Sequence, residues 1–362
     1  MFKKTQKLVS KTQLKQKFPV DLKTKKQGDF VIKSILSGED KRLLCIVGPC
    51  SIDSEKSVFL YLEKLKSLHE LTKDKLFIVP RLHTLKPRSR DGFKGLIFNQ
   101  TKEGFDEKIN AEIRNLDQAK ALNIDQFKIQ SFDQDINSGL TLCRKIFVSA
   151  INDFGFCPSD ELLFIDLYDF FDDCISHYTI GARTALSSQH RYLASGLSAP
   201  TGFKNPINGD IDALLDSVFV AQSPNVFAQN GHQIQSFGNP FAHAIFRGFV
   251  DTQGDHHSNI TQSHIEKFIK NQTQKGLKNV PLIIDLSHSN SQKDFAIQPK
   301  NLQAVASLFK NKDAKQSIKG IMAESFLFDG RSDTPQFGYS LTDSCMGFEL
   351  TKKTILDFCD KI

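Results

Sequence analysis

Short apolar segments recur along the chain, and each is followed by Gly or polar residues and then by a longer stretch with helical periodicity. Alternation of this kind is typical of parallel β-α units. Eight segments fit the pattern. The predicted strands are residues 43–48, 76–82, 162–167, 178–182, 199–204, 243–248, 281–286 and 320–323.

The segments between these strands predict helices, for example over residues 54–71 and 299–309. Eight strands with right-handed crossovers predict an α/β fold of the (β/α)8 barrel type, also called a TIM barrel. Residues 101–140 form a polar stretch too long for a simple connection, and residues 223–242 predict a hairpin added to the barrel. We therefore expect an N-terminal extension, residues 1–40, before a catalytic barrel over residues 41–362.

Charge is distributed unevenly along the chain. The net charge is +6, but nine Lys and a single Asp before residue 27 supply +8 of it, which leaves about −2 for the remainder. A nucleic-acid groove, which needs cations across the fold, is therefore not expected. We expect the Lys-rich arm to be solvated or to contact another subunit, in a regulatory or assembly role.

Membrane and disulfide frameworks are not expected either. No window approaches 18 uninterrupted apolar residues, and the N-terminus lacks a secretory apolar core, so we predict a cytoplasmic protein. Seven Cys without C-x-x-C spacing predict free thiols, and Cys157, Cys174 and Cys359 are expected to be packing residues. His256 and His257 are expected in a polar loop.

Cationic side chains stand at or just beyond the ends of several predicted strands. A single Arg there usually makes a surface ion pair, but barrel enzymes place their chemistry at this end of the strands. Several cations at one rim would repel one another unless an anionic ligand lay among them. Phosphate and carboxylate groups suit Arg and Lys best. The cations are Arg81, Lys86, Arg183, Lys204 and Arg247.

Four further residues could hold a divalent metal. Cys50 follows the first strand, His288 follows the seventh, Glu324 follows the eighth, and Asp343 lies farther along. One thiolate, one imidazole and two carboxylates make a plausible donor set with an open position for a substrate oxygen. The alternative is a buried Cys near unrelated polar residues, and the wide sequence separation leaves both readings open.

These residues fall within a series of ordered motifs. The motifs are Gly48-Pro49-Cys50-Ser51-Ile52, Lys86-Pro87-Arg88, Gly92-Phe93-Lys94-Gly95-Leu96, Gly181-Ala182-Arg183-Thr184, Gly202-Phe203-Lys204-Asn205, Ser287-His288-Ser289-Asn290-Ser291, Glu324-Ser325 and Thr342-Asp343-Ser344-Cys345-Met346-Gly347. Over residues 42–348 the chain resembles the type I 3-deoxy-D-arabino-heptulosonate 7-phosphate (DAHP) synthases. The resemblance implies a transferase that condenses phosphoenolpyruvate with erythrose 4-phosphate and releases phosphate, the first step of aromatic amino-acid (shikimate and chorismate) biosynthesis.

The resemblance also implies roles for individual residues. The implied ligands of a divalent Mn, Fe, Co or Zn ion are Cys50, His288, Glu324 and Asp343. The implied phosphoenolpyruvate contacts are Arg81, Lys86, Arg183, Lys204 and Arg247, and the implied aldose-phosphate contacts are Arg88 and Ser89. The metal is expected to act as a Lewis acid on the aldehyde. Cys50, His288 and Lys86 are the expected catalytic groups, and we expect neighbouring cations to lower the pKa of Lys86.

Some positions depart from the family pattern. Leu85, Leu163 and Leu186 stand where the family typically carries Glu, so we expect the cationic mouth to lose three counter-charges that orient its Arg and Lys side chains. The insertion at residues 101–128 and a shortened hairpin at 228–240 alter regions linked to inhibitor binding, so an aromatic amino-acid effector is a weaker expectation. A homodimer or homotetramer is expected by resemblance.

Two other functions are compatible with parts of the sequence. One is a condensing paralogue that uses another aldose phosphate, such as a 3-deoxy-D-manno-octulosonate 8-phosphate synthase. The other is a non-catalytic regulatory relative, which the three Leu replacements favour. Full retention of Lys86-Pro87-Arg88-Ser89 favours erythrose 4-phosphate over another aldose phosphate. The intact set of metal-type and phosphate-binding residues argues against a non-catalytic relative.

Overall fold

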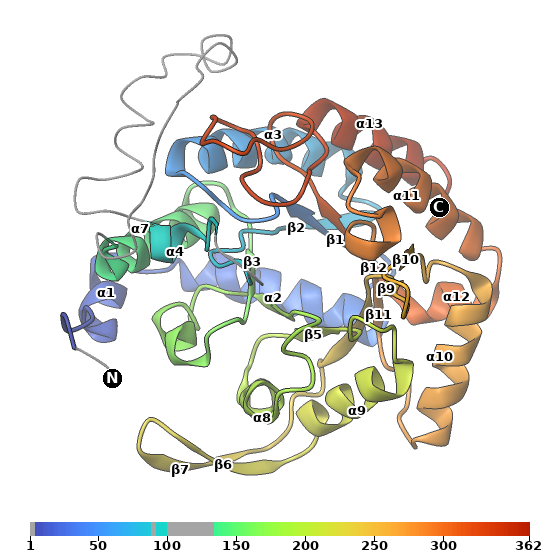
Figure 1. Cartoon of the computed structure of the whole chain (residues 1–362), viewed down its shortest axis with the longest axis horizontal. Helices are drawn as coiled ribbons and strands as arrows, with labels where there is room; N and C mark the ends of the chain where they lie inside the picture. Colours follow the sequence, from blue (N-terminus) through green and yellow to red (C-terminus); the bar gives the residue numbers. More distant parts are fainter. Residues whose placement is uncertain (1–3, 88–91, 100–133) are drawn as a thin grey trace.

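The computed structural model describes residues 4–87, 92–99 and 134–362. Eight parallel strands form one sheet in the order β2-β1-β12-β11-β8-β5-β4-β3, with helices around it (Figure 1). The first and last strands of this order meet at a parallel bridge between Arg81 and Ser159, where the Leu82 amide donates to the Ser159 carbonyl at 2.9 Å. The sheet therefore closes on itself, and the predicted (β/α)8 fold is confirmed.

The barrel strands are short, and most are buried at every position. They are β1 (Leu43–Gly48), β2 (Leu76–Pro80), β3 (Ser159–Glu161), β4 (His177–Ile180), β5 (Thr201–Lys204), β8 (His243–Phe246), β11 (Leu282–Asp285) and β12 (Ile318–Glu324). Seven of the eight overlap the predicted segments. Continuous burial on both faces is the expected signature of a parallel sheet covered by helices.

Helices surround these strands. They are α3 (Glu55–Thr72), α4 (Leu96–Asn99), α7 (Ile136–Asn152), α8 (Ser188–Gly196), α9 (Ile211–Gln222), α10 (Gln262–Gln274), α11 (Gln298–Leu308), α12 (Lys312–Ser317) and α13 (Phe348–Cys359), with 3-10 turns η1 (Ile165–Phe170), η2 (His288–Ser291) and η3 (Phe295–Ile297). Apolar periodicity located α3 and α11 to within one residue at each end. The Ser54 hydroxyl caps α3 by accepting from the Ser57 amide.

The prediction for the third strand was wrong. Residues 162–167 were expected to form it because they are apolar, but β3 is the polar segment Ser159–Glu161, and η1 begins at Ile165. All three strand residues are buried. They are tolerated because they find partners: Asp160, for example, accepts from the Thr84 amide and hydroxyl, both at 2.9 Å. A hydrophobicity pattern cannot detect a strand of this kind.

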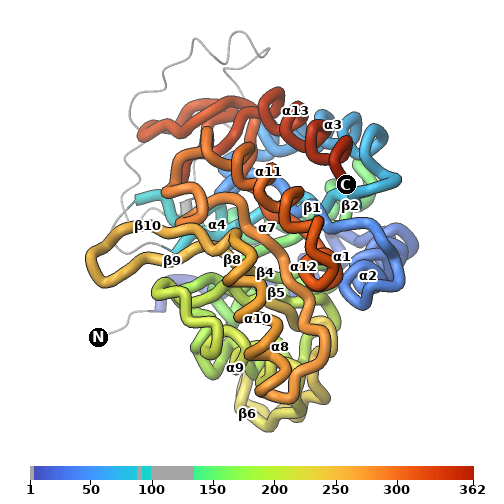
Figure 2. The backbone as a smooth tube through the Cα atoms, turned by 90° about the vertical axis from the view of Figure 1, so that its right-hand side faces the viewer, coloured from blue at the N-terminus to red at the C-terminus, as the bar shows by residue number. Residues whose placement is uncertain are grey.

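The N-terminal segment contributes two helices, α1 (Lys11–Lys17) and α2 (Leu22–Ser37). The buried side chains Ile32, Ile35 and Leu36 of α2 join a core cluster with inward-facing strand residues such as Ile46 and Met322. This helix thus closes the end of the barrel where the strands begin, and Figure 2 shows it on the side away from β10. Lys11 and Lys15 of α1 form ion pairs with Asp169 and Asp172 of the same chain.

Part of the barrel interior is polar. The Nδ1 atom of His243 lies 3.0 Å from the Phe241 carbonyl and must carry the hydrogen, which leaves Nε2 as an acceptor. His177 then donates to it from Nε2 at 3.1 Å and accepts from the Ser159 hydroxyl at Nδ1, at 2.8 Å. Burial lowers the pKa of both imidazoles, that of His243 to about 4, so the chain of hydrogen bonds is neutral.

Two short antiparallel ribbons decorate the barrel. Strands β6 (Asn225–Gln229) and β7 (His232–Ser236) form the hairpin predicted for residues 223–242. Strands β9 (Phe249–Val250) and β10 (His256–His257) form the second, so the two adjacent His lie in a strand and not in the expected loop. Within the described ranges, no helix is long and apolar enough to cross a membrane.

Candidate active site

The expected donor residues come together where the strands end. Cys50 lies just beyond β1, Glu324 ends β12, and Asp343 reaches them from the segment before α13. One potential ligand atom from each of these residues lies within 4.8 Å of the other two. The Lys86 Nζ atom sits 2.6 Å from the Cys50 sulfur and 2.8 Å from an Asp343 oxygen. Two of the three potential metal ligands, Cys50 and Asp343, therefore lie around the Lys86 ammonium group.

This donor set fits a divalent metal. Thiolate and carboxylate ligands together suit zinc and the first-row transition metals. Burial, and then the charge of Glu324, raise the pKa of Cys50 to about 12, so the sulfur needs a positive charge beside it in order to ionise at neutral pH. Cys50, Glu324 and Asp343 are thus a chemically coherent candidate metal centre.

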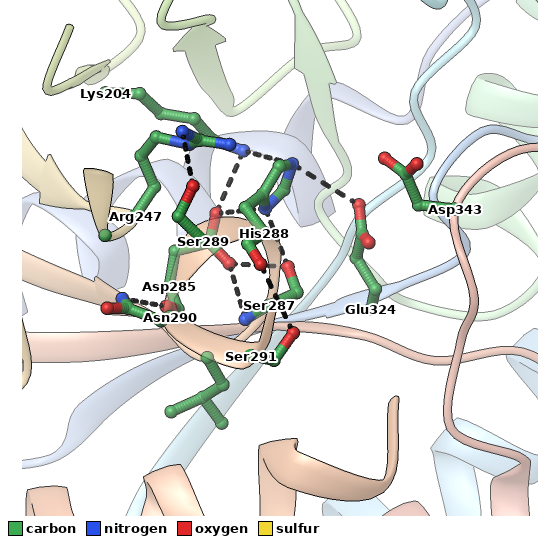
Figure 3. A network of polar contacts seen from close by, with 12 residues as sticks. Lys204, Arg247, Asp285, Ser287, His288, Ser289, Asn290, Ser291, Glu324 and Asp343 are labelled. Atoms are coloured by element: carbon green, nitrogen blue, oxygen red, sulfur yellow. Dashed lines mark hydrogen bonds and ion pairs between the residues drawn. The ribbon is translucent and has the colours of Figure 1, made fainter. Parts of the chain in front are cut away.

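His288 lies at the edge of this group. Its Nε2 atom is 3.6 Å from the Glu324 carboxylate and 3.3 Å from Lys204 Nζ. On its other side, Nδ1 lies 2.9 Å from Asp285 and 2.8 Å from the Ser287 hydroxyl (Figure 3). A carboxylate at Nδ1 that directs Nε2 toward the centre is the usual support of a metal-binding His. His288 is thus oriented toward the site, but it stands outside the three-residue cluster.

Three of the five expected substrate cations are neutralised by the protein itself. Arg81 is buried and pairs with Glu324 at 3.1 Å, Lys86 pairs with Asp343 at 2.8 Å, and Lys204 pairs with Asp285 at 2.9 Å. The expected mutual repulsion of five cations was therefore wrong for these three.

The other two cations differ. Arg247 is buried and donates to the Ser289 hydroxyl at 3.1 Å, whereas Arg183 is exposed. Neither forms an ion pair with a carboxylate among the residues that the structure describes. Burial lowers the pKa of Arg247; the negative charge of Asp285 opposes this effect, and the positive charge of Arg183 adds to it, so the two guanidinium groups influence each other. A bound anion would therefore be most favourable beside these two arginines.

The expected effect on Lys86 was also wrong. Burial disfavours its ammonium form, but Cys50, Asp343 and Glu324 outweigh that cost and raise the pKa of Lys86 above its usual value. The sequence analysis considered only neighbouring cations, whereas the closest charged partner is the carboxylate of Asp343. Lys86 is therefore a permanent cation at neutral pH, able to donate a proton but not to accept one.

The mouth contains a further counter-charge in spite of the three Leu replacements. Glu161, two residues before Leu163, supplies a buried carboxylate whose oxygen lies 3.4 Å from His83 Nδ1. Burial opposes its ionisation, but His83, Lys204 and Lys86 lower the pKa of Glu161 to about 2. The sequence pattern did not indicate this residue, because the predicted third strand began at Leu162.

The remaining expected residues divide into two groups. Leu85 is buried in the core, and Leu186 is half exposed. The expected aldose-phosphate contacts, Arg88 and Ser89, lie outside the described residues, as does the insertion at 101–128. His256, which sequence analysis set aside, donates or accepts at Nδ1 with the Ser289 hydroxyl at 3.0 Å, next to Arg247.

Comparison with known proteins bears on this site. A model of the DAHP synthetase I family matches residues 17–354. The chain belongs to this family. A Tyr-sensitive phospho-2-dehydro-3-deoxyheptonate aldolase of Salmonella typhimurium is 32% identical over 358 residues, 95% of this chain and 90% of that protein. A phospho-2-dehydro-3-deoxyheptonate aldolase of Haemophilus influenzae is 33% identical over 348 residues, covering 93% of this chain and 86% of that protein.

Solved structures agree with this assignment to the DAHP synthetase I family. A phospho-2-dehydro-3-deoxyheptonate aldolase from Francisella tularensis superposes with a TM-score of 0.84 at 29% identity, covering 100% of this chain and 98% of that one. A structure from Thermotoga maritima, at 18% identity and a TM-score of 0.56, shares the fold. The family and the enzyme class expected from the motifs are therefore confirmed.

Asp160 provides a test of the electrostatics at this mouth. Burial raises its pKa from 3.8 to about 7, although Thr84 donates to it. Because the folded state holds a proton that the unfolded state releases, the contribution of Asp160 to the free energy of unfolding should fall as pH rises through this window. Asp160→Asn, which cannot ionise, should be more stable than the parent at pH 8 by about 1–3 kcal/mol and nearly equal to it at pH 4.

Urea unfolding of both proteins at the two pH values measures this difference. Asp333→Asn, at a side chain that is 86% exposed, is the matched control and should show no pH-dependent difference. An Asp160→Asn variant whose stability relative to the parent is the same at pH 4 and pH 8 contradicts the assignment.

Proposed function

We propose that this protein is a DAHP synthase that condenses phosphoenolpyruvate with erythrose 4-phosphate and releases inorganic phosphate. Two observations at the barrel mouth carry the proposal: two arginines that pair with no carboxylate among the described residues, and a buried cluster of thiol and carboxylate donors. The first feature suits an anionic substrate, and the second suits a metal-assisted reaction at an aldehyde. Membership of the DAHP synthetase I family supports the same conclusion.

Phosphoenolpyruvate carries a carboxylate and a phosphate, and the mouth offers cations for both. Arg247 and Arg183 form no ion pair within the part of the chain that the structure describes, so they are the strongest candidates to bind one anionic group. Lys204 and Lys86 lie deeper, where Asp285 and Asp343 fix their ammonium groups. Paired cations of this kind orient the substrate and contribute less net charge.

Lys86 and the candidate metal centre would act on the oxygen atoms of the reaction. Lys86 stays protonated, so it can donate a hydrogen bond or a proton to an oxygen that gains negative charge. Cys50, Glu324 and Asp343, with His288 as the fourth ligand, would hold a divalent Mn, Fe, Co or Zn ion. Such an ion supplies Lewis acidity toward a carbonyl oxygen when it is bound.

Regulation and assembly extend the proposal. Relatives are named Tyr-sensitive and Trp-sensitive, the latter including an Escherichia coli protein that is 33% identical over 334 residues. An aromatic amino acid is therefore the effector class that we propose. A cytoplasmic homodimer or homotetramer is the assembly expected from the sequence. Neither a different aldose phosphate nor a non-catalytic role is favoured by these relatives.

Phosphate release from phosphoenolpyruvate, measured with a panel of aldose phosphates, tests the reaction directly. We expect erythrose 4-phosphate to give a kcat/KM at least tenfold above arabinose 5-phosphate or ribose 5-phosphate. A chelator should abolish turnover, and excess divalent metal should restore it. Preference for a five-carbon aldose would identify a paralogue, and no release with any aldose would indicate a non-catalytic relative.

Cys50→Ala tests the metal centre. Loss of the thiolate should lower bound metal at least tenfold and reduce kcat by a factor of a hundred or more, because one ligand and its charge are removed. Cys45→Ala is the matched control, since Cys45 is a buried thiol within β1, the strand that precedes Cys50, and belongs to the hydrophobic core. Metal content and phosphate release are measured on both. Full metal occupancy and activity in Cys50→Ala would refute the ligand role.

Arg247→Ala tests the substrate pocket. Removing a buried cation that contacts a substrate anion should weaken phosphoenolpyruvate binding by about 2–4 kcal/mol, or roughly 30- to 1000-fold. Lys267→Ala, an exposed cation on α10, should bind as the parent does. Calorimetric titration with phosphoenolpyruvate measures both, and equal affinities would rule out the assigned contact.

A further inference from the structure

A second pocket lies at the end of the barrel opposite the candidate active site. Its volume is about 930 Å³. It is bordered by the chain around the starts of β1, β2 and β12, by α12, and by Ile362, which follows α13. Leu43 lines the pocket and begins β1, whereas Cys50 lies beyond the other end of the same strand. The length of the strand therefore separates the two sites.

The lining of this basal pocket is strongly cationic. Seven of its fourteen residues are Lys or Arg, against two Asp. Some of these cations are satisfied internally: Arg42 pairs with Asp40 at 2.7 Å, and Lys75 donates to the Cys359 carbonyl at 2.6 Å. An excess of positive charge nevertheless remains on one wall.

That wall is formed by α12 and the start of β12. Lys312, Lys315 and Lys319 line it, and none of them pairs with a carboxylate in the part of the chain that the structure describes. Lys312 and Lys315 are exposed, whereas Lys319 is partly buried. Burial lowers the pKa of Lys319, and the charge of Lys41, another residue of the pocket lining, lowers it further. Like charges held together in this way are unfavourable unless an anion lies between them.

The pocket lining also includes apolar residues. Leu43 and Ile318 are buried at the pocket base, and Phe309 borders it at the end of α11. Lys supplies point charges and does not impose the bidentate geometry of Arg, so the cationic wall suits a chain of phosphate groups in several orientations. The volume falls within the range of small-molecule and cofactor sites.

The geometry points to a binding site for a small organic polyanion, of the class of a nucleoside polyphosphate, with its phosphates on the α12 wall and its ring on the apolar base. This site is distinct from the proposed catalytic mouth and does not depend on the proposed reaction. Its residues lie at the end of the strands where the proposed chemistry does not take place. Variants in it should therefore leave basal phosphate release unchanged.

Calorimetric titration of the full chain with ATP, inorganic triphosphate and adenosine tests the proposal. The titrations are made in saturating phosphoenolpyruvate, so that the cations of the mouth are occupied. We expect ATP to bind with one site per chain, triphosphate to bind more weakly, and adenosine to bind at least a hundredfold more weakly than ATP. Lys315→Gln/Lys319→Gln should weaken ATP binding at least tenfold.

The matched control is Lys267→Gln, which removes an exposed cation outside the pocket and should bind ATP as the parent does. Thermal unfolding verifies that the double variant is folded. Phosphate release without ATP, compared between the parent and the double variant, separates this site from the proposed reaction. The proposal is overturned if ATP does not bind, or if adenosine binds as tightly as ATP. It is also overturned if the Lys315→Gln/Lys319→Gln variant binds ATP as tightly as the Lys267→Gln control.

Discussion

A series of buried polar and ionic contacts organises the mouth of the barrel. Arg81 faces Glu324, Glu324 faces His288, and His288 and Lys204 both face Asp285. Each ion would cost several kcal/mol if it were buried alone. The contacts cross from β2 to β12, β11 and β5, so they form only when the strands lie in the correct order and register. The fold and the site therefore specify each other.

Internal pairing also determines which groups remain for ligands. A cation that already has a carboxylate partner contributes orientation, and a cation without one contributes charge. Arg247 and Arg183 belong to the second kind, whereas Lys86 and Lys204 belong to the first. The same reasoning applies to the donor cluster, because Lys86 now satisfies two atoms that could instead hold a metal ion. A metal ion bound by Cys50 and Asp343 would therefore compete with Lys86 for these two atoms.

The sequence predicted the fold well because its information is local. Apolar segments and helical periodicity located seven strands, and the motifs identified the residues that meet at one end. The third strand escaped because Ser159–Glu161 is polar, and its burial depends on partners such as Thr84 that are distant in sequence. The charge state of Lys86 escaped for the same reason. Its controlling neighbour, Asp343, lies 257 residues away.

The two ends of the barrel solve the same electrostatic problem differently. At the mouth, Asp285 of β11, Glu324 of β12 and Asp343 neutralise three of the five expected substrate cations. At the base, α2 covers the barrel axis with apolar side chains, and the cations stand to one side, around α12, where few carboxylates face them. Exposure to water lowers the cost of unpaired lysines, but Lys319 is partly buried and gains little from it. A polyanion would relieve this charge without any change in the strands, which makes the base a binding surface independent of the chemistry above it.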